Sequence, residues 1–286
     1  MPTGTAFGQA KVTLVSIRSM SVSEVSDKGS RLAKVPGDAK VADVRRLMRE
    51  KGYRTVAVVD SEGGERFIGV VTRGDVLMVS SSKSEATASS LASVPPVILG
   101  PGTRLSEALN LMLKEDVWEA PIVSSGAFSG FLGVGDVIRV LLERAQEVLE
   151  GGLVRDYMTP NPVAVLADDF VARIWRRMVE LRYAGLPVVE EGGRLVGMIT
   201  QYDLLVKGFT RIHLESESGA SRGPRVREAM TRAVRFVTPW STLADAARLM
   251  VGNGFGRIPV VDDPRGMKLV GVIDREDVIK VLGELP

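Results

Sequence analysis

Four aspartates occupy matching positions in a motif that the chain repeats. Each copy begins with Gly, continues with two apolar and three variable residues, and ends in Asp before another apolar run. The copies span residues 69–75, 130–136, 197–203 and 271–277, and end in Asp75, Asp136, Asp203 and Asp277. One carboxylate per copy, placed at a strand-to-helix turn, is typical of ligand binding, because acid–base catalysis needs groups gathered at one centre. The aspartates are 61, 67 and 74 residues apart. Recurrence of a motif on this scale indicates a fold built from copies of one unit.

A second apolar phrase precedes each motif, and three of its four copies contain Pro. The phrases are residues 56–59, 120–123, 186–189 and 258–261. A polar turn, usually containing Gly, joins each phrase to its motif, which predicts a β-hairpin. An apolar stripe at helical spacing lies upstream, and in the fourth copy it begins at a Thr242/Asp245 capping box and ends at residues 252–254. Each unit is therefore predicted to be strand, helix, strand, strand, helix.

This order of elements, together with both phrases, resembles the cystathionine β-synthase (CBS) domain family over residues 20–284. The resemblance implies an α+β fold of four tandem CBS domains, paired into two Bateman modules with pseudo-twofold symmetry. The expected domains are residues 1–82, which include an N-terminal extension, followed by 83–150, 151–218 and 219–286. Members of this family bind adenosine-containing ligands between paired domains and commonly report nucleotide status to an enzyme, channel or transporter.

Composition predicts a cytoplasmic protein with apolar cores. The chain of 286 residues is 45% hydrophobic and 25% charged, and its length fits about two modules. No apolar run approaches the ~18 residues that span a bilayer, and the N-terminus lacks the pattern of a signal peptide. The lack of Cys excludes disulfides and thiolate metal sites. Three Asn and three Gln are few, which suggests a thermophile or simply reflects genomic composition.

The residue inventory argues against an enzyme. A single histidine, His213, excludes a two-His metal motif within one subunit, and no Gly-x-x-x-x-Gly-Lys-Ser/Thr loop is present. The glycines of residues 252–256 resemble a dinucleotide loop, but they follow a helix, and Arg257 stands where the last Gly belongs. A helix stop is the preferred interpretation. We therefore expect no catalytic residue, no metal and no required cofactor.

The resemblance assigns ribose binding to the four motif aspartates. A carboxylate can accept charge-assisted hydrogen bonds from both ribose hydroxyls. Three residues earlier the family favours Thr or Ser, and Thr72 and Thr200 fit that position. Gly133 and Asp274 depart from it, and Asp274 would repel a nearby phosphate unless a cation intervened. The alternative is that each aspartate simply caps the helix that follows it.

The rest of the pocket is inferred from the same resemblance, in which the purine lies against the first strand of a repeat and the apolar residues of its hairpin. The residues so predicted for the third copy are Thr159, Asn161, Pro162, Val163, Leu186 and Pro187. Their alternative role is strand-edge and core packing. Arg257 matches a basic residue that reaches phosphates across the cleft in the γ subunit of AMP-activated protein kinase, and its alternative role is a solvated surface one.

The predicted function is a regulatory sensor that binds an adenine nucleotide (AMP, ADP or ATP) or S-adenosylmethionine. Its expected partners are this adenosyl ligand, a second copy bound through the module faces, and an unidentified effector protein, with no membrane. The alternative is an interaction scaffold with vestigial clefts, in which arginines of residues 222–235 or the segment 80–93 contact a protein or nucleic acid. Nucleic acid is the less favoured partner, because Glu228 interrupts the arginines and the net charge is only +2.

Overall fold

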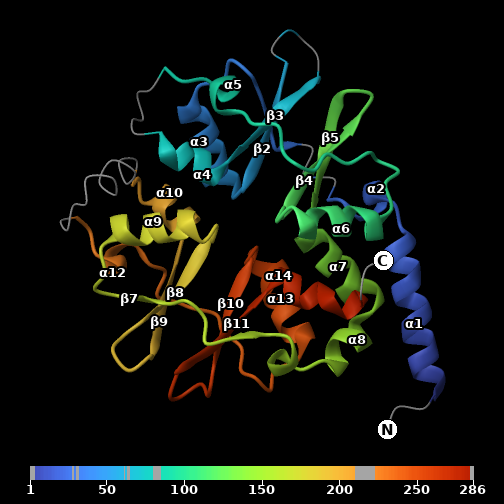
Figure 1. Cartoon of the computed structure of the whole chain (residues 1–286), viewed down its shortest axis with the longest axis vertical. Helices are drawn as coiled ribbons and strands as arrows, with labels where there is room; N and C mark the ends of the chain where they lie inside the picture. Colours follow the sequence, from blue (N-terminus) through green and yellow to red (C-terminus); the bar gives the residue numbers. More distant parts are fainter. Residues whose placement is uncertain are drawn as a thin grey trace.

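The computed structural model describes residues 4–27, 29, 32–60, 62, 65–79, 85–209 and 223–283. Four repeats lie in one layer around a common centre (Figure 1). His213 and the rest of residues 210–222, between the third and fourth repeats, lie outside the described residues. In the part of the chain that the structure describes, no helix combines the length and the apolar character needed to cross a membrane.

The first module contains repeats 1 and 2. Two helices precede it, α1 (Gly4–Ser19) and α2 (Val22–Val25). Repeat 1 comprises β1 (Lys34–Pro36), α3 (Val41–Lys51), β2 (Thr55–Val59), β3 (Phe67–Thr72) and α4 (Arg73–Met78). Repeat 2 comprises α5 (Ala88–Leu91), α6 (Leu105–Lys114), β4 (Glu119–Ser124), β5 (Ala127–Gly133), α7 (Val134–Arg144) and α8 (Gln146–Gly151).

The second module contains repeats 3 and 4. A short 3₁₀ turn, Val154–Asp156, opens it. Repeat 3 comprises β6 (Thr159–Pro160), β7 (Val165–Leu166), α9 (Val171–Glu180), β8 (Gly185–Val189), β9 (Leu195–Thr200) and α10 (Gln201–Val206). Repeat 4 comprises α12 (Val226–Ala229), α13 (Leu243–Asn253), β10 (Arg257–Val261), β11 (Leu269–Asp274), α14 (Arg275–Ile279) and the 3₁₀ turn Lys280–Leu282.

The predicted hairpin and its flanking helices are confirmed in all four repeats, whereas the predicted first strand is a regular strand only in repeats 1 and 3. The four hairpins are antiparallel, and β1 and β7 pair in parallel with β2 and β8. In repeats 2 and 4 the first strand is reduced to single parallel bridges, from Leu99 to Ile122 and from Val237 to Val260. The predicted helix in repeat 4 is confirmed as well, because Thr242 caps α13 and Gly254 ends it with a left-handed φ of 69°.

In repeats 1, 3 and 4 the Gly that opens the motif is required because the chain of the neighbouring repeat crosses the hairpin there. A side chain at Gly69 would place its Cβ 2.7 Å from the carbonyl oxygen of Ser93 in repeat 2. A Cβ at Gly271 would lie 2.7 Å from Sδ of Met158 in repeat 3, and one at Gly197 would collide with Met230 in repeat 4. The two repeats of a module are therefore interlocked through their sheets.

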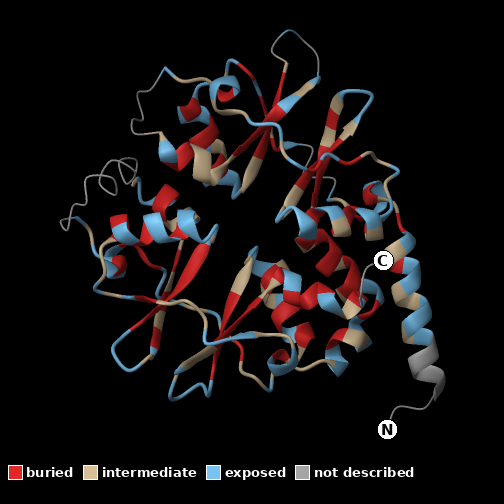
Figure 2. Cartoon of the chain, viewed as in Figure 1, coloured by how far each residue is buried: buried red, intermediate tan, exposed pale blue. Residues whose placement is uncertain are grey.

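The two modules meet through their helices, and like repeats face one another. Helix α10 of repeat 3 contacts α3 and α4 of repeat 1, while α13 and α14 of repeat 4 contact α7 of repeat 2. One apolar core is accordingly shared by repeats 1 and 3 and a second by repeats 2 and 4. Figure 2 shows these buried helix faces turned towards the neighbouring repeats. Each core thus belongs to both modules.

The N-terminal extension is helical, which the sequence pattern did not predict. Helix α1 packs near its C-terminal end on α6 and α7, where Ile17 is 1% exposed. Val12 and Val15 on the same helix are exposed. Because few of its apolar residues are buried, the helix carries no clear apolar stripe for sequence analysis to detect.

Candidate functional site

One carboxylate oxygen, Oδ2, of every motif aspartate caps the helix that follows. It accepts the amide of the residue three positions earlier, at 2.7 Å from Thr72 to Asp75 and at 2.8 Å from Gly133 to Asp136, Thr200 to Asp203 and Asp274 to Asp277. Thr72 and Thr200 also donate their hydroxyls to this oxygen, at 2.7 and 2.6 Å. Helix capping is therefore confirmed for Oδ2, so that Oδ1 is the atom that differs between the repeats.

In repeats 2 and 4 a cation one helical turn further on neutralises Oδ1. Asp136 pairs with Arg139, and Asp277 pairs with Lys280 at 2.7 Å. Both aspartates are buried, with exposed fractions of 8% and 5%. Burial raises the pKa of both carboxyls, although the capping amide and the neighbouring cation act in the opposite direction. These two carboxylates are thus closed off and already paired.

In repeats 1 and 3 the aspartate is accessible and has no cationic partner among the described residues. Asp75 and Asp203 are only half-buried. Met78 and Val206 stand one turn further on, at the positions of Arg139 and Lys280, and carry no charge. We therefore call repeats 1 and 3 the open pair and repeats 2 and 4 the closed pair.

A residue of repeat 4 completes the surroundings of Asp203. The hydroxyl of Thr231 donates to Asp203 Oδ1 at 2.6 Å, and the backbone of Thr231 bridges Met198 on β9. The sequence analysis missed Thr231, although the dipeptide Met-Thr occurs at both 158–159 and 230–231 and could have revealed it. The surroundings of Asp203 thus come from both repeats of its module.

Two of the residues predicted for the site of the third copy, Thr159 and Asn161, pair with the hairpin of repeat 4. Thr159 pairs with Val272 on β11, and the amide of Asn161 donates to the carbonyl of Val270 at 3.2 Å. Residues 159–161 therefore lie along β11, the strand that leads to Asp277. The physical reason is the interlock within the module, in which the segment ahead of β7 crosses to the hairpin of repeat 4, while β7 itself pairs with β8 of its own repeat.

Leu186 and Pro187 lie in the predicted hairpin strand but are buried. Leu186 is 0% exposed and belongs to the core shared by repeats 1 and 3. Val163 also packs against this core. For Leu186 the structure therefore shows core packing, the alternative role considered from the sequence.

Arg257 is held inside the cleft by three partners. Its Nε and Nη2 bind both carboxylate oxygens of Asp274 at 2.7 Å, and Nη1 donates to the carbonyl of Gly185 at 3.2 Å. The guanidinium carbon lies 4.1 Å from the ring centroid of Tyr183. Burial alone would lower the pKa of Arg257, but its hydrogen bonds to Asp274 and the charge of that residue raise it. Arg257 is thus the cation that neutralises Asp274.

Three further arginines gather where the repeats meet, at the centre of the layer. The pKa of both Arg73 and Arg275 is lowered to about 10, mainly by burial and secondly by the charge of Arg54. Glu119 is the acid that acts on both in the opposite direction. Arg54 donates to the carbonyl of Gly254 at 3.0 Å, which ties repeat 1 to repeat 4 across the centre. Asp203 also acts on Arg73, and Asp136, itself paired with Arg139, acts on Arg275. The mutual repulsion of the guanidinium groups suits the cluster to an anion.

Gly256 makes room for this cluster. A Cβ at this position would lie 2.8 Å from Nη1 of Arg54. The Gly-rich run at residues 252–256 therefore has two structural roles, since Gly254 ends α13 and Gly256 admits the guanidinium of Arg54. Neither role involves a dinucleotide.

The comparisons with known proteins agree along nearly the whole chain. The model of the CBS domain matches residues 22–82, 88–143, 154–207 and 226–284. Uncharacterized protein MJ1225 of Methanocaldococcus jannaschii is 29% identical over 255 residues, which cover 82% of this chain and 89% of that protein.

Two solved structures share the arrangement of the repeats. The crystal structure of MJ1225, described as a candidate archaeal homolog of g-AMPK, has a TM-score of 0.77 and 25% identity and covers 91% of this chain and 99% of its own. A conserved protein from Pyrococcus horikoshii has a TM-score of 0.59 and 23% identity, with coverage of 92% and 100%, which shows a likeness of fold.

Proposed function

The chain belongs to the CBS domain family, with four domains in two modules, and from that premise we propose that it is a regulatory protein that binds an adenosyl ligand at the open pair. The proposed ribose acids are Asp75 and Asp203. Asp136 and Asp277, named with them from the sequence, are excluded from this proposal because Arg139 and Lys280 already occupy their Oδ1 atoms.

The observation that carries the proposal is the state of Oδ1 in the open pair. Asp75 Oδ1 has no hydrogen-bond or ion-pair partner among the described residues, and Asp203 Oδ1 accepts only the neutral hydroxyl of Thr231. A ribose hydroxyl can bond the first atom directly and can replace or join Thr231 at the second. The helix cap is unaffected, because it uses Oδ2.

The central arginines favour an anionic ligand. Arg73 is the first residue of α4, between Thr72 and Asp75, and its guanidinium lies against Tyr202 of repeat 3, where the charge of Asp203 acts on it. A phosphate near Arg73 and Arg54 would offset the mutual repulsion that contributes to the lowered pKa of Arg73. Within the predicted ligand set, this supports an adenine nucleotide over S-adenosylmethionine, whose sulfonium is cationic.

Mass spectrometry of the purified protein, followed by thermal melting, tests the proposal. We expect an adenine nucleotide to co-purify, and we expect AMP to raise the melting temperature more than adenosine or S-adenosylmethionine at equal concentration. A melting temperature that none of these compounds changes would contradict the proposed function.

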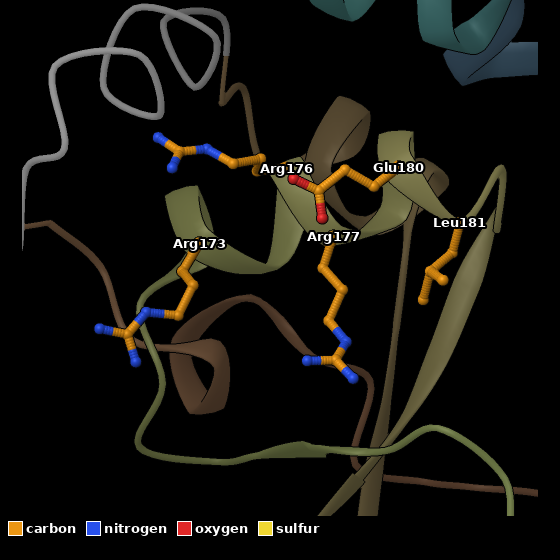
Figure 3. A pocket seen from close by; sticks show the side chains of 5 residues that line it. All are labelled: Arg173, Arg176, Arg177, Glu180 and Leu181. Atoms are coloured by element: carbon orange, nitrogen blue, oxygen red, sulfur yellow. The ribbon is translucent and has the colours of Figure 1, made fainter.

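One observation favours the scaffold as a second candidate. The arginines of α9 line an open hollow of about 330 Å³ with Glu180 and Leu181, and Arg173 and Arg177 point to the same side of the helix (Figure 3). Helix α12, which carries Arg227, packs on α9, so two distant arginine-rich segments meet on the outer face of repeat 3. Co-purification of nucleic acid that is released by salt, with no nucleotide response in melting, would favour this candidate.

Replacement of Asp274 by threonine is expected to strengthen AMP binding while leaving adenosine binding unchanged. The substitution removes the carboxylate that occupies Arg257, and Thr can cap α14 as it does at the equivalent positions of repeats 1 and 3. Because Arg257 then loses its partner in a half-buried site, the melting temperature of the free protein should fall. Titration calorimetry with both compounds measures the effect.

The control for this substitution is Asp274→Asn, which keeps the size of the side chain but removes its charge. It should also strengthen AMP binding, though less than Asp274→Thr if the amide retains contact with Arg257. Weaker AMP binding in both variants would show that the Arg257–Asp274 pair itself supports the ligand.

A further inference from the structure

We propose that Arg73 and Tyr202 are positioning residues that couple the two clefts of the open pair, so that a ligand in one raises the affinity of the other. This inference rests on the proposed function, since it concerns ligands at Asp75 and Asp203. It adds a connection between the two sites that neither cleft requires for binding.

Each of the two residues lies inside the turn that presents a ribose acid. Arg73 stands between Thr72 and Asp75, and Tyr202 stands between Thr200 and Asp203. The two turns belong to different modules and are far apart in sequence. Since α10 contacts α4, the head-to-head arrangement of the modules brings them together.

The turns are joined directly. The guanidinium carbon of Arg73 lies 4.7 Å from the ring centroid of Tyr202, which is a cation–π contact between repeats 1 and 3. No other residue intervenes, so a shift of either turn alters the packing of the other.

Both residues are also anchored to the end of α3. Arg73 Nε donates to the carbonyl of Tyr53 at 2.9 Å, and its Nη2 donates to the carbonyl of Gly52. The hydroxyl of Tyr202 donates to the carbonyl of Arg49 at 3.0 Å. These bonds bring the last carbonyls of α3 and both turns into one connected unit, with few independent motions left to each turn.

In the closed pair the equivalent arginine lies beside a glycine instead of an aromatic ring. Arg275 occupies the position of Arg73 in repeat 4, and its guanidinium lies beside Gly135 in repeat 2, which has no side chain to contact. The arginine is thus present in both pairs, whereas the ring is present only where two accessible aspartates face one another. The Arg73–Tyr202 contact therefore occurs in the pair of repeats with accessible aspartates, as expected if it serves ligand binding rather than packing alone.

The coupling between the two sites is expected to be positive, because a bound ligand restricts the motion of the turn that holds it. A ribose on Asp75 fixes its turn and, through Arg73 and Tyr202, also fixes the turn of Asp203, so the second ligand loses less conformational freedom. Electrostatics oppose this effect for anions, because a first phosphate lowers the positive potential at the centre. A neutral probe, adenosine, separates the two effects.

The experiment is titration of the full chain with adenosine. The parent protein should bind two molecules, the second at least about fivefold more tightly than the first after statistical correction. In Tyr202→Leu this ratio should fall to one. The single-site affinities, measured in the Asp75→Ala and Asp203→Ala backgrounds, should stay within about twofold when Tyr202→Leu is added. Loss of structure alone would weaken the single sites too.

Two further variants act as controls. Tyr202→Phe keeps the ring over Arg73 and should retain most of the coupling. Trp240→Leu removes a different ring, which lies 4.4 Å from the guanidinium of Arg155 and outside both turns, and should leave the coupling unchanged.

Three results have distinct meanings. Independent binding of two adenosines by the parent overturns the coupling but leaves the proposed function intact. Coupling that persists in Tyr202→Leu shows that these residues do not carry it, which also overturns the inference. A parent that binds neither adenosine nor AMP contradicts the proposed function, and the coupling falls with it.

Discussion

The Asp203→Ala variant is expected to lose roughly tenfold or more in AMP affinity at its cleft, and Asp75→Ala should do the same at the other cleft of the open pair. The reason is the loss of charge-assisted hydrogen bonds to a ribose, which costs about 1.5–3 kcal/mol. Titration calorimetry should therefore show one strong binding event fewer in each variant than in the parent.

The closed pair provides matched controls. Asp136→Ala and Asp277→Ala remove the same helix cap, but their Oδ1 atoms already pair with Arg139 and Lys280. Both variants should melt at lower temperature yet keep the AMP affinity of the parent within about twofold. If they lose affinity while Asp75→Ala and Asp203→Ala do not, the assignment of open and closed repeats is reversed.

Separation of the modules is expected to yield two chains, residues 1–151 and 152–286, that assemble one to one when expressed together. Val137 of the first module and Ala246 of the second are both 0% exposed and lie in one shared core. Each module alone would leave such surface in water, at a cost of about 25 cal/mol per Å² of apolar area. Native mass spectrometry of the co-expressed chains measures the stoichiometry.

The first module alone is expected to pair with itself less well than with the second. A homodimer would place Gly74 where the second module supplies Tyr202, so that Arg73 would lose its cation–π contact and the bond from the Tyr202 hydroxyl to the carbonyl of Arg49 would be missing. When both modules are present, native mass spectrometry should therefore show the mixed complex in excess of the homodimer. Monomeric modules that melt cooperatively would contradict the shared cores.

Local features of the fold could be predicted because each has a local cause. Gly254 ends α13 through its own left-handed backbone, and Thr242 begins it through a capping box with Asp245, so both are visible within a dozen residues of sequence. The hairpins are equally local. Even the difference between the open and closed pairs was present in the sequence, since Arg139 and Lys280 stand three residues after their aspartates.

The partners of the candidate site could not be predicted, because they depend on which segments cross. Thr231 reaches Asp203 only through the interlock between repeats 3 and 4, and Tyr202 meets Arg73 only through the pairing of repeats 1 and 3. The resemblance identified Arg257 as a cation of the cleft, but it did not place Asp274 and Tyr183 against its guanidinium. The spacing of residues within a motif does not indicate which distant segments of the chain will contact it.

The crossing at Gly69, Gly197 and Gly271 also limits how this architecture can change in length. If one repeat were deleted, the hairpin of its neighbour would keep a bare glycine at the crossing and an unpaired strand edge, which is a template for association with other chains. Deletion of the first module exposes no such edge in the second, because repeats 3 and 4 cover each other's hairpins. Gain or loss of repeats in a chain built this way should therefore occur in twos, so that the unit of duplication is the pair and not the single domain.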